Sequence, residues 1–412
     1  MLSLIKDYSK LDKPILNLIA VEFFVQLINV AFVAILPLYM KAEGYSDAEY
    51  AHFTSYRYFG MLALAVSLGI YIKNRKILPL FYVAAIGVPL FGFLILVGVH
   101  LHYMSLILIA HLLWGTCYTF IQIPVLPYIL RNAPSEQHTL AITLNYVMWS
   151  LASIISSLIV AVFNQIDPDL FNERNLLFAI AIIGFVGVHF VVKIKKEEQV
   201  PSPQEKKKAS IRDYDWKLII KALTPTTIIA IGAGFTIPFI SLFFSNVHNM
   251  STAAISIINF LAACLVTYIA MLVPSIKKKY GYKKAVPTTQ SLAIIALIIM
   301  ATTQYYSEYS IAVYVAVIFY LLRQPLMNTA APMTSEITMN YVGEKNREMT
   351  SALTSAIWSG STYFSAVVFG ILRHLDVRYV NIFLITAGMY IVGVIWYSIL
   401  IYDSEKRGIS VK

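Results

Sequence analysis

The chain has 412 residues, of which 58% are hydrophobic and only 13% are charged. Soluble domains carry about 25% charged residues, so this composition excludes a soluble protein such as a cytosolic enzyme or a secreted disulfide scaffold. The formal net charge is +10, but the basic residues lie mainly in alternate loops, which indicates membrane orientation and not nucleic-acid binding. The two cysteines, Cys117 and Cys264, lie in separate apolar segments, so no disulfide, metal site or other cofactor site is expected.

Apolar segments of about 20 residues, each long enough to cross ~30 Å of hydrocarbon, recur along the whole chain. They predict an all-α polytopic membrane protein with twelve transmembrane helices. The first ten residues are too polar for a removable signal peptide. The predicted helices cover residues 14–40, 47–72, 77–99, 103–130, 137–164, 174–194, 224–246, 251–275, 285–305, 309–339, 347–372 and 378–402.

Lysine and arginine are distributed unequally between the two sides of the predicted membrane. If the N-terminus is cytoplasmic, 26 of the 32 lie in cytoplasmic segments and only Lys41, Arg174, Arg373 and Arg378 lie outside. Cytoplasmic loops are enriched in these residues. We therefore predict an inner-membrane protein of the cell with both termini in the cytoplasm.

A polar segment rich in Lys, Glu and Pro, residues 195–223, separates two halves of six helices, 1–194 and 224–412. It is predicted to be a cytoplasmic linker, in which Ser210 and Asp213 could cap a short amphipathic helix at 216–223 on the inner membrane surface. The halves are alike, because Trp149-Ser150 aligns with Trp358-Ser359. Two parallel six-helix repeats are typical of transporters with a pseudo-two-fold axis along the membrane normal.

With this repeat, the whole chain resembles the major facilitator superfamily. The segment with Lys278, Lys279, Gly281, Lys283 and Lys284 resembles the family's G-x-x-x-D-R-x-G-R-R loop motif, with Lys278 in place of Asp. His111-Leu-Leu-Trp114-Gly115 resembles the helix 4 signature R-x-x-Q-G, with His in place of Arg. The Gly-Pro motif of drug antiporters is missing from helix 5, residues 145–157. The resemblance implies a monomeric transporter whose helices 1, 4, 7 and 10 line a central cavity, with helices 2, 5, 8 and 11 beside them.

Charged residues inside a bilayer cost about 2.5–3.5 kcal/mol each and usually mark functional sites. Four ionisable residues lie well inside predicted helices, namely Glu22, Arg57, His111 and Arg323, and the resemblance places all four near the cavity. Polar stripes on the same helices complete the predicted set for substrate binding and coupling. That set is Glu22, Gln26, Asn29, Arg57, His111, Gln122, Asn145, Trp149, Arg323, Gln324, Asn328 and Trp358.

Each of these residues also has a structural interpretation, which stays open at this point. Glu22 and Arg57 could form a pair that joins helices 1 and 2. Arg323 could be a scaffold residue, and His111, Trp149 and Trp358 could be packing residues.

A second predicted set would close the cytoplasmic side in one state of the transport cycle. We expect an ion pair between Glu336 and Lys278, Lys279 or Arg347, in a network that includes Gly281. This network resembles the cytoplasmic charge network of facilitators.

The predicted function is secondary active transport of a small organic solute by alternating access. Two intramembrane arginines favour an anion, because guanidinium pairs bidentately with carboxylate or phosphate. Proton coupling, as in a symporter, is suggested by Glu22 and His111, since a desolvated carboxyl binds protons readily and histidine titrates near neutral pH. The alternatives are a multidrug exporter with an aromatic cavity and a polytopic membrane transferase. The transferase would depend on Asp47 and Glu49, which with Ser46 also fit the start of a helix.

Overall fold

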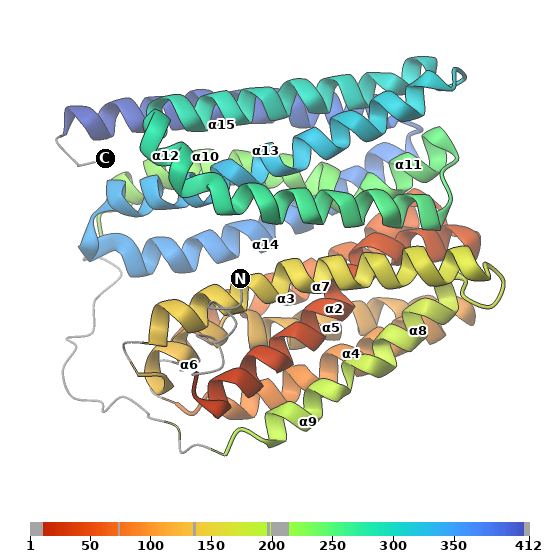
Figure 1. The fold of residues 1–412 in the computed structure, drawn as a ribbon, viewed down its shortest axis with the longest axis horizontal. Coiled ribbons are helices and arrows are strands. Elements are labelled where there is room, and N and C mark those ends of the chain that lie inside the picture. Colours follow the sequence, from red (N-terminus) through yellow and green to blue (C-terminus); the bar gives the residue numbers. More distant parts are fainter. Residues whose placement is uncertain (1–10, 73–74, 135–136, 196–197, 199–213, 408–412) are drawn as a thin grey trace. The chain divides into compact units, whose positions relative to one another are not determined.

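The computed structural model describes residues 11–72, 75–134, 137–195, 198 and 214–407, and every regular element in this part of the chain is a helix (Figure 1). In chain order the α-helices and the short 3-10 helices η3 and η4 are α2 (Lys13–Ala42), α3 (Asp47–Ile72), α4 (Leu78–His100), α5 (Met104–Gln122), α6 (Val125–Asn132), α7 (His138–Ile166), α8 (Glu173–Gly184), α9 (Val186–Val192), α10 (Trp216–Thr236), η3 (Ile237–Phe239), α11 (Ile240–His248), α12 (Thr252–Thr302), η4 (Thr303–Tyr306), α13 (Ile311–Val342), α14 (Glu344–His374) and α15 (Tyr379–Lys406).

Within the described residues, eleven helical segments are long and apolar enough to cross a membrane. Helix α3, which carries Arg57, is not among them, but its 26 residues are long enough to span a bilayer. Two of the eleven segments lie within α12, which changes direction at Gly281, where φ is +64°. Such a backbone angle is readily adopted only by glycine, so this residue separates the predicted helices 251–275 and 285–305.

Two details differ from the sequence-based expectations. Residues 216–223 are the first turns of α10, capped by the Asp215 carboxylate, which accepts from the main-chain N–H of Leu218, and are not a separate helix. The proposed cap at Ser210 and Asp213, and most of the predicted linker, lie outside the described residues. The second difference is at Pro124, which separates α5 from α6 within the predicted helix 103–130, whereas Pro325 and Pro332 lie inside α13 without ending it, in agreement with the predicted helix 309–339.

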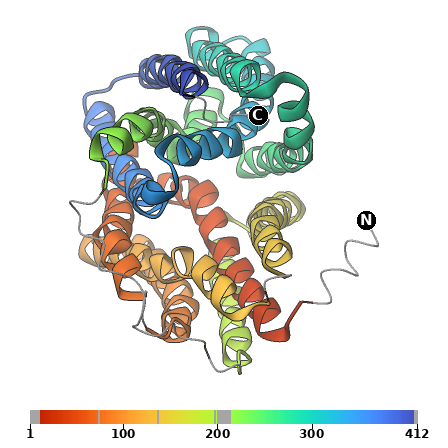
Figure 2. The ribbon, with the colours of Figure 1, turned by 90° about the vertical axis from the view of Figure 1, so that its left-hand side faces the viewer.

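The chain divides into two compact units, of which the first comprises Met1–Ser46 and Phe53–Lys206. In this unit α2 packs against α4, α7, α8 and α9, and α4 packs along α5 (Figure 2). Small residues set the separation between α3 and α5, because Gly60 lies against the carbonyl of Leu112 and Gly115 against the carbonyl of Arg57. The backbone that carries Arg57 therefore lies directly on α5.

Substitution of Gly115 by Ala is expected to destabilise the protein by about 1–3 kcal/mol, because the added Cβ would overlap the main-chain oxygen of Arg57 and force α3 away from α5. Gly388→Ala on α15 is the matched control, since nothing lies within 4 Å of the position that its Cβ would occupy. Thermal unfolding in detergent should show a lower Tm for Gly115→Ala only. Equal Tm values for the two variants would contradict this account of the α3–α5 contact.

Glu198 anchors the polypeptide after α9 to the start of α4. Its carboxylate accepts hydrogen bonds from the main-chain N–H groups of Ile77 at 2.7 Å and Leu78 at 3.1 Å. The guanidinium of Arg131 lies 3.9 Å away. A carboxylate is favourable at this position because the N-terminal end of a helix carries a partial positive charge.

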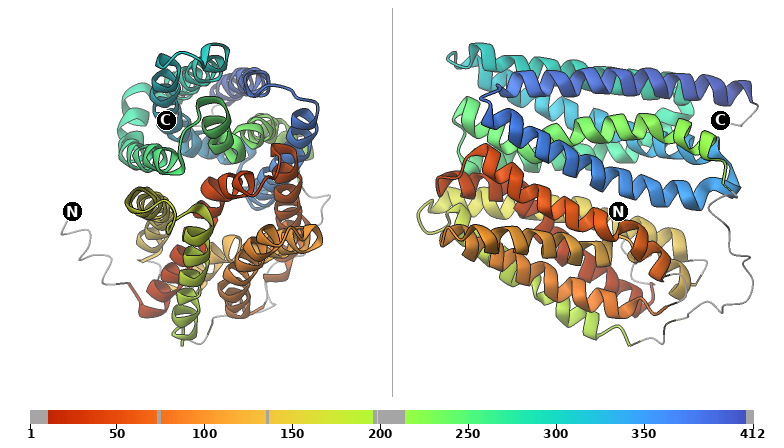
Figure 3. Two further views of the ribbon diagram at one scale, coloured as in Figure 1. Left: turned by 90° about the vertical axis from the view of Figure 1, so that its right-hand side faces the viewer. Right: turned by 180° about the vertical axis from the view of Figure 1, so that it is seen from behind.

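The second unit comprises Asp47–His52 and Lys207–Lys412. Here α10 packs between α14 and α15, and α12 packs along α13 and α15 (Figure 3). The first turn of α3 belongs to this unit, and the contacts of the Asp47 carboxylate hold it in place. Asp47 accepts from Arg373 at 2.9 Å, from the Tyr379 hydroxyl at 2.6 Å and from the Asn246 amide at 3.0 Å.

Candidate functional site

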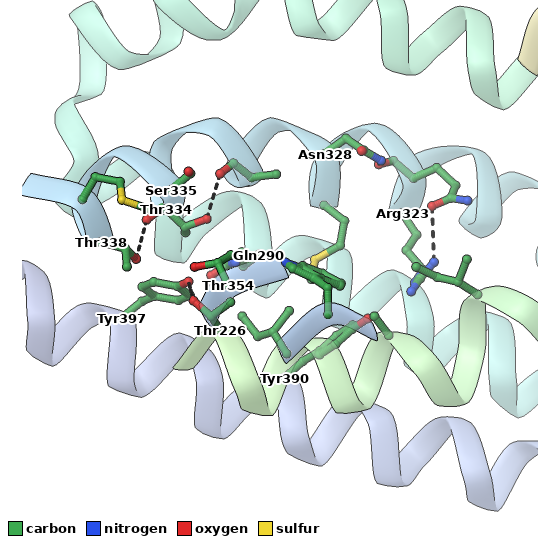
Figure 4. A pocket seen from close by; sticks show the side chains of 18 residues that line it. Thr226, Gln290, Arg323, Asn328, Thr334, Ser335, Thr338, Thr354, Tyr390 and Tyr397 are labelled. Atoms are coloured by element: carbon green, nitrogen blue, oxygen red, sulfur yellow. Dashed lines mark hydrogen bonds between the residues drawn. The ribbon is translucent and has the colours of Figure 1, made fainter. Parts of the chain in front are cut away.

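A cavity of about 250 Å³ lies among the helices of the second unit (Figure 4). Four residues of the predicted substrate-binding set line it, namely Arg323, Gln324, Asn328 and Trp358. The structure therefore brings together all members of that set that lie on α13 and α14. The cavity's other lining residues are Thr226, Ile229, Ala233, Ile237, Gln290, Met327, Ala331, Thr334, Ser335, Thr338, Met339, Thr354, Tyr390 and Tyr397.

Arg323 is the most unusual residue of this cavity, because its side chain is charged and only 2% exposed. One of its terminal nitrogens donates to the Gln324 side-chain oxygen at 3.4 Å, and its Nε has no hydrogen-bond partner in the described structure. None of the described residues that line the cavity is acidic. The guanidinium is therefore buried beside the cavity with neutral neighbours alone.

The other polar groups near Arg323 belong to an ordered chain of hydrogen bonds. The Gln324 amide donates to the Tyr320 hydroxyl at 3.2 Å, and that hydroxyl donates to Asn259 at 2.8 Å. At the opposite end of the cavity, the hydroxyls of Thr226 and Tyr397 lie 2.8 Å apart (Figure 4). These bonds fix the orientation of the lining side chains before any ligand arrives.

The first unit contains a separate buried polar cluster formed by α2, α3, α5 and α7. Glu22 accepts hydrogen bonds from the Gln26 amide at 2.7 Å and from the Trp149 indole at 3.1 Å. The Gln26 amide also donates to Tyr118 at 3.0 Å. The predicted stripe of Glu22, Gln26 and Asn29 thus shares one face of α2, as their spacing of four and three residues requires.

Arg57 joins the same cluster through Asn29, to whose side-chain oxygen it donates a hydrogen bond. Its guanidinium also lies over the Trp114 ring, 3.8 Å from the ring centroid. Glu22, which is 1% exposed, makes no ion pair in the described part of the chain. The alternative of a direct Glu22–Arg57 pair is therefore not what the structure contains, since both residues bond to neutral groups instead.

Three predicted residues of the first unit are not drawn into this cluster by any of the described contacts. His111 is buried, bonds through Nδ1 to the Ile107 carbonyl at 2.9 Å and packs on Phe53. That environment corresponds to the packing interpretation. Gln122 is exposed at the end of α5, and Asn145 is half-buried on α7.

Sequence reasoning missed several residues that the structure places at these sites. Gln290 lines the cavity although it belongs to the ninth predicted helix, which is not among those that the family resemblance places at or beside the cavity. Its signal was present, because it lies in the polar stretch Thr288-Thr289-Gln290-Ser291 inside a predicted membrane helix. Trp114 stood in the segment that resembles the helix 4 signature but was not in the predicted set. Tyr390 and Tyr397 gave no signal, since aromatic residues are common throughout membrane helices.

The predicted cytoplasmic network has a different pairing. Glu336 bonds to Lys277 at 3.0 Å, and not to Lys278, Lys279 or Arg347 as the sequence suggested. Arg347 instead donates to the Met339 carbonyl and to Asn340. Lys277 precedes the alternatives by one or two residues, and a rotation of 100° per residue along a helix decides which lysine faces α13. Lys278 and Lys279 are exposed.

One of the two acidic residues considered for a membrane transferase has a structural role. The Asp47 carboxylate accepts hydrogen bonds from Arg373, Tyr379 and Asn246, so it anchors the start of α3.

The chain is similar to solved structures of several transporters that share one fold. The nucleoside transporter NupG superposes with a TM-score of 0.68 at 13% identity, over 94% of this chain and 99% of that chain. A D-xylose-proton symporter gives 0.72 at 13%, over 93% and 97%. A bacterial homologue of the iron transporter ferroportin, in its inward-facing state, gives 0.70 at 14%, over 93% and 97%. No curated protein sequence matches the chain.

A family model supplies the assignment. The model described as Major Facilitator Superfamily matches residues 4–157 and 169–336, which is most of the chain. This match and the structural neighbours confirm the resemblance and the predicted all-helical fold of two repeats. The protein belongs to the Major Facilitator Superfamily and is an integral, multi-pass membrane transporter, not an enzyme.

Proposed function

We propose that this transporter is a secondary active carrier that moves a small organic anion by alternating access. The observation that carries the proposal is the buried Arg323 guanidinium, which borders a cavity without any acidic residue among its described lining. An uncompensated charge in a low-dielectric interior is costly, and a bound carboxylate or phosphate would compensate it. The sites proposed for this chemistry are the second-unit cavity and the first-unit polar cluster.

The size of the cavity also favours a small solute. Its volume of about 250 Å³ falls below the range of about 300–1,000 Å³ that is typical for drug-sized ligands. Several apolar side chains do line it, among them Ile229, Met327 and Trp358. These residues support the competing function, export of lipophilic drugs, and they make it the alternative to be tested.

Proton coupling is the second part of the proposal and depends on Glu22. Its carboxylate is buried and bonded to the neutral side chains of Gln26 and Trp149, so no cation among its described bonding partners holds it in the ionised form. Such a group can bind and release a proton as its access to each side changes. The similar D-xylose-proton symporter shows that proton symport occurs in this fold.

The orientation and assembly belong to the same proposal. The excess of basic residues in alternate loops supports cytoplasmic termini in the cell's inner membrane. We propose that the linker at residues 195–223 divides the two halves of the chain and that the protein functions as a monomer. The Lys277–Glu336 pair belongs to the proposed cytoplasmic network near Gly281.

A ligand screen on the purified full-length protein tests the solute class. Succinate, gluconate, glucose and tetraphenylphosphonium would be compared for their effects on Tm, because a ligand that binds only the folded state stabilises it. Stabilisation by an anion is the expected result. Stabilisation by the lipophilic cation alone would contradict the anion proposal and favour drug export.

A further inference from the structure

Resting on the proposed anion transport, we propose that the second-unit cavity binds a polyhydroxylated acid, with its carboxylate or phosphate at Arg323 and its hydroxyls along the rest of the cavity. The hydrogen-bonding groups that the lining residues still offer, once their own bonds are counted, determine which solute the cavity can bind. The lining offers more free acceptors than free donors. It therefore favours a ligand that carries hydrogen-bond donors in addition to a negative charge.

Gln290 provides the first observation. Its side chain is 3% exposed, lines the cavity, and has an Oε1 atom without a hydrogen-bond partner in the described structure. Figure 4 places it between Arg323 and the threonines at the far end. A buried amide oxygen without a donor is unfavourable, so this position calls for a ligand that donates a hydrogen bond.

Other lining residues have already used their own donors. The Thr354 hydroxyl donates to the Thr350 carbonyl at 2.8 Å, and the Thr334 hydroxyl donates to the Ala330 carbonyl at 3.1 Å. One N–H of the Asn328 amide donates to the Gln324 carbonyl at 2.9 Å, which leaves its side-chain oxygen and its second N–H. What these side chains can offer a ligand is therefore mainly oxygen lone pairs, which accept from hydroxyl or amine groups.

Charge decides between hydroxyl and ammonium donors. A ligand ammonium would need a carboxylate, and none of the described lining residues is acidic. Hydroxyl groups need only neutral acceptors, which Gln290, Thr354 and Asn328 provide. Trp358 and Tyr390 add aromatic faces of the kind on which the C–H faces of a sugar pack.

The dimensions agree with such a solute. The cavity volume of about 250 Å³ lies just below the range of about 300–1,000 Å³ for drug-sized ligands, which suits a small solute such as gluconate. Arg323 and Thr334 are three turns apart on α13, about 16 Å along the helix axis. A chain with its anionic group at one end and hydroxyls along its length can contact Arg323 and the central acceptors together.

Binding to the full-length protein in detergent tests this inference with four probes: gluconate, 6-phosphogluconate, glucose and hexanoate. Gluconate or 6-phosphogluconate should bind at least about tenfold more tightly than glucose, which lacks the charge, and hexanoate, which lacks the hydroxyls. Binding of gluconate would show that a carboxylate suffices at Arg323, whereas binding of 6-phosphogluconate alone, which carries both groups, would show that the phosphate is needed.

The Gln290→Met variant keeps the length of the side chain but removes the amide. It should weaken binding of the preferred hydroxylated acid by about tenfold and leave hexanoate unchanged. Gln165→Met, an exposed position on α7, is the control for folding.

Hexanoate that binds as well as both hydroxylated acids would overturn the hydroxyl inference and leave the anion proposal standing. Glucose that binds as well as both acids, with no effect of Arg323→Gln, would overturn both. Absence of binding by gluconate and 6-phosphogluconate would also overturn the inference.

Discussion

Replacing Arg323 with Gln is expected to weaken binding of the transported anion by about 100-fold while the protein without ligand becomes no less stable. Loss of a charge-assisted hydrogen bond costs about 1.5–3 kcal/mol, which corresponds to tenfold to 150-fold in Kd. The guanidinium is buried, and no carboxylate pairs with it in the described structure. Removal of an unpaired buried charge does not cost stability, so the Tm without ligand should stay equal or rise.

The opposite pair of results is what a scaffold role predicts. If Arg323 mainly holds α13 in place, Arg323→Gln should lower the Tm and leave the Kd for the anion nearly unchanged. Arg323→Lys gives a finer test, because lysine keeps the charge but not the planar guanidinium group. The affinity of this variant for the anion should lie between those of the native protein and Arg323→Gln. Arg378→Gln is the control, since Arg378 is exposed at the start of α15.

Helices were the easiest feature to predict because the bilayer imposes their length and composition. A segment such as Leu78–His100 is almost wholly apolar, and hydropathy alone finds it. Helix ends were harder where a helix continues into water. Residues 216–223 read as a separate amphipathic helix, but α10 continues from them through Pro225 into the apolar segment.

Contacts within one helix were also predictable, whereas contacts between helices were less so. The shared face of Glu22, Gln26 and Asn29 follows from their spacing. The position of Gln290 at the cavity depends on how α12 packs on its neighbours, which no local pattern encodes. The same reason explains why Glu336 contacts Lys277 and not the lysines beside it.

Prolines in α13 show how tertiary context overrides a local signal. In soluble proteins, Pro325 and Pro332 would each predict a helix end. The described helix continues past both, as is tolerated in membrane helices, where neighbouring helices and hydroxyl side chains satisfy the freed carbonyls. The rule for soluble proteins would thus predict breaks where both the predicted helix 309–339 and the described α13 continue along the cavity.

Substitution of Glu22 by Gln is expected to abolish proton-driven accumulation but to leave exchange intact. Glutamine has nearly the same shape and can still accept from the Trp149 indole, so the polar cluster should keep its structure. It cannot release or take up a proton. A gradient of one pH unit corresponds to about 1.4 kcal/mol, which supports roughly tenfold accumulation of a solute that moves with one proton.

Proteoliposomes loaded at pH 7.5 and diluted into pH 6.5 buffer separate the two activities. With labelled gluconate as the probe, the native protein should concentrate it about tenfold, whereas Glu22→Gln should equilibrate it without concentration. Counterflow against unlabelled gluconate needs no net proton movement and should proceed in both proteins. Glu308→Gln, at an exposed turn before α13, should behave as the native protein. Accumulation that persists in Glu22→Gln would remove this carboxyl from the coupling mechanism, because its neighbours Gln26 and Trp149 have no proton to exchange in its place.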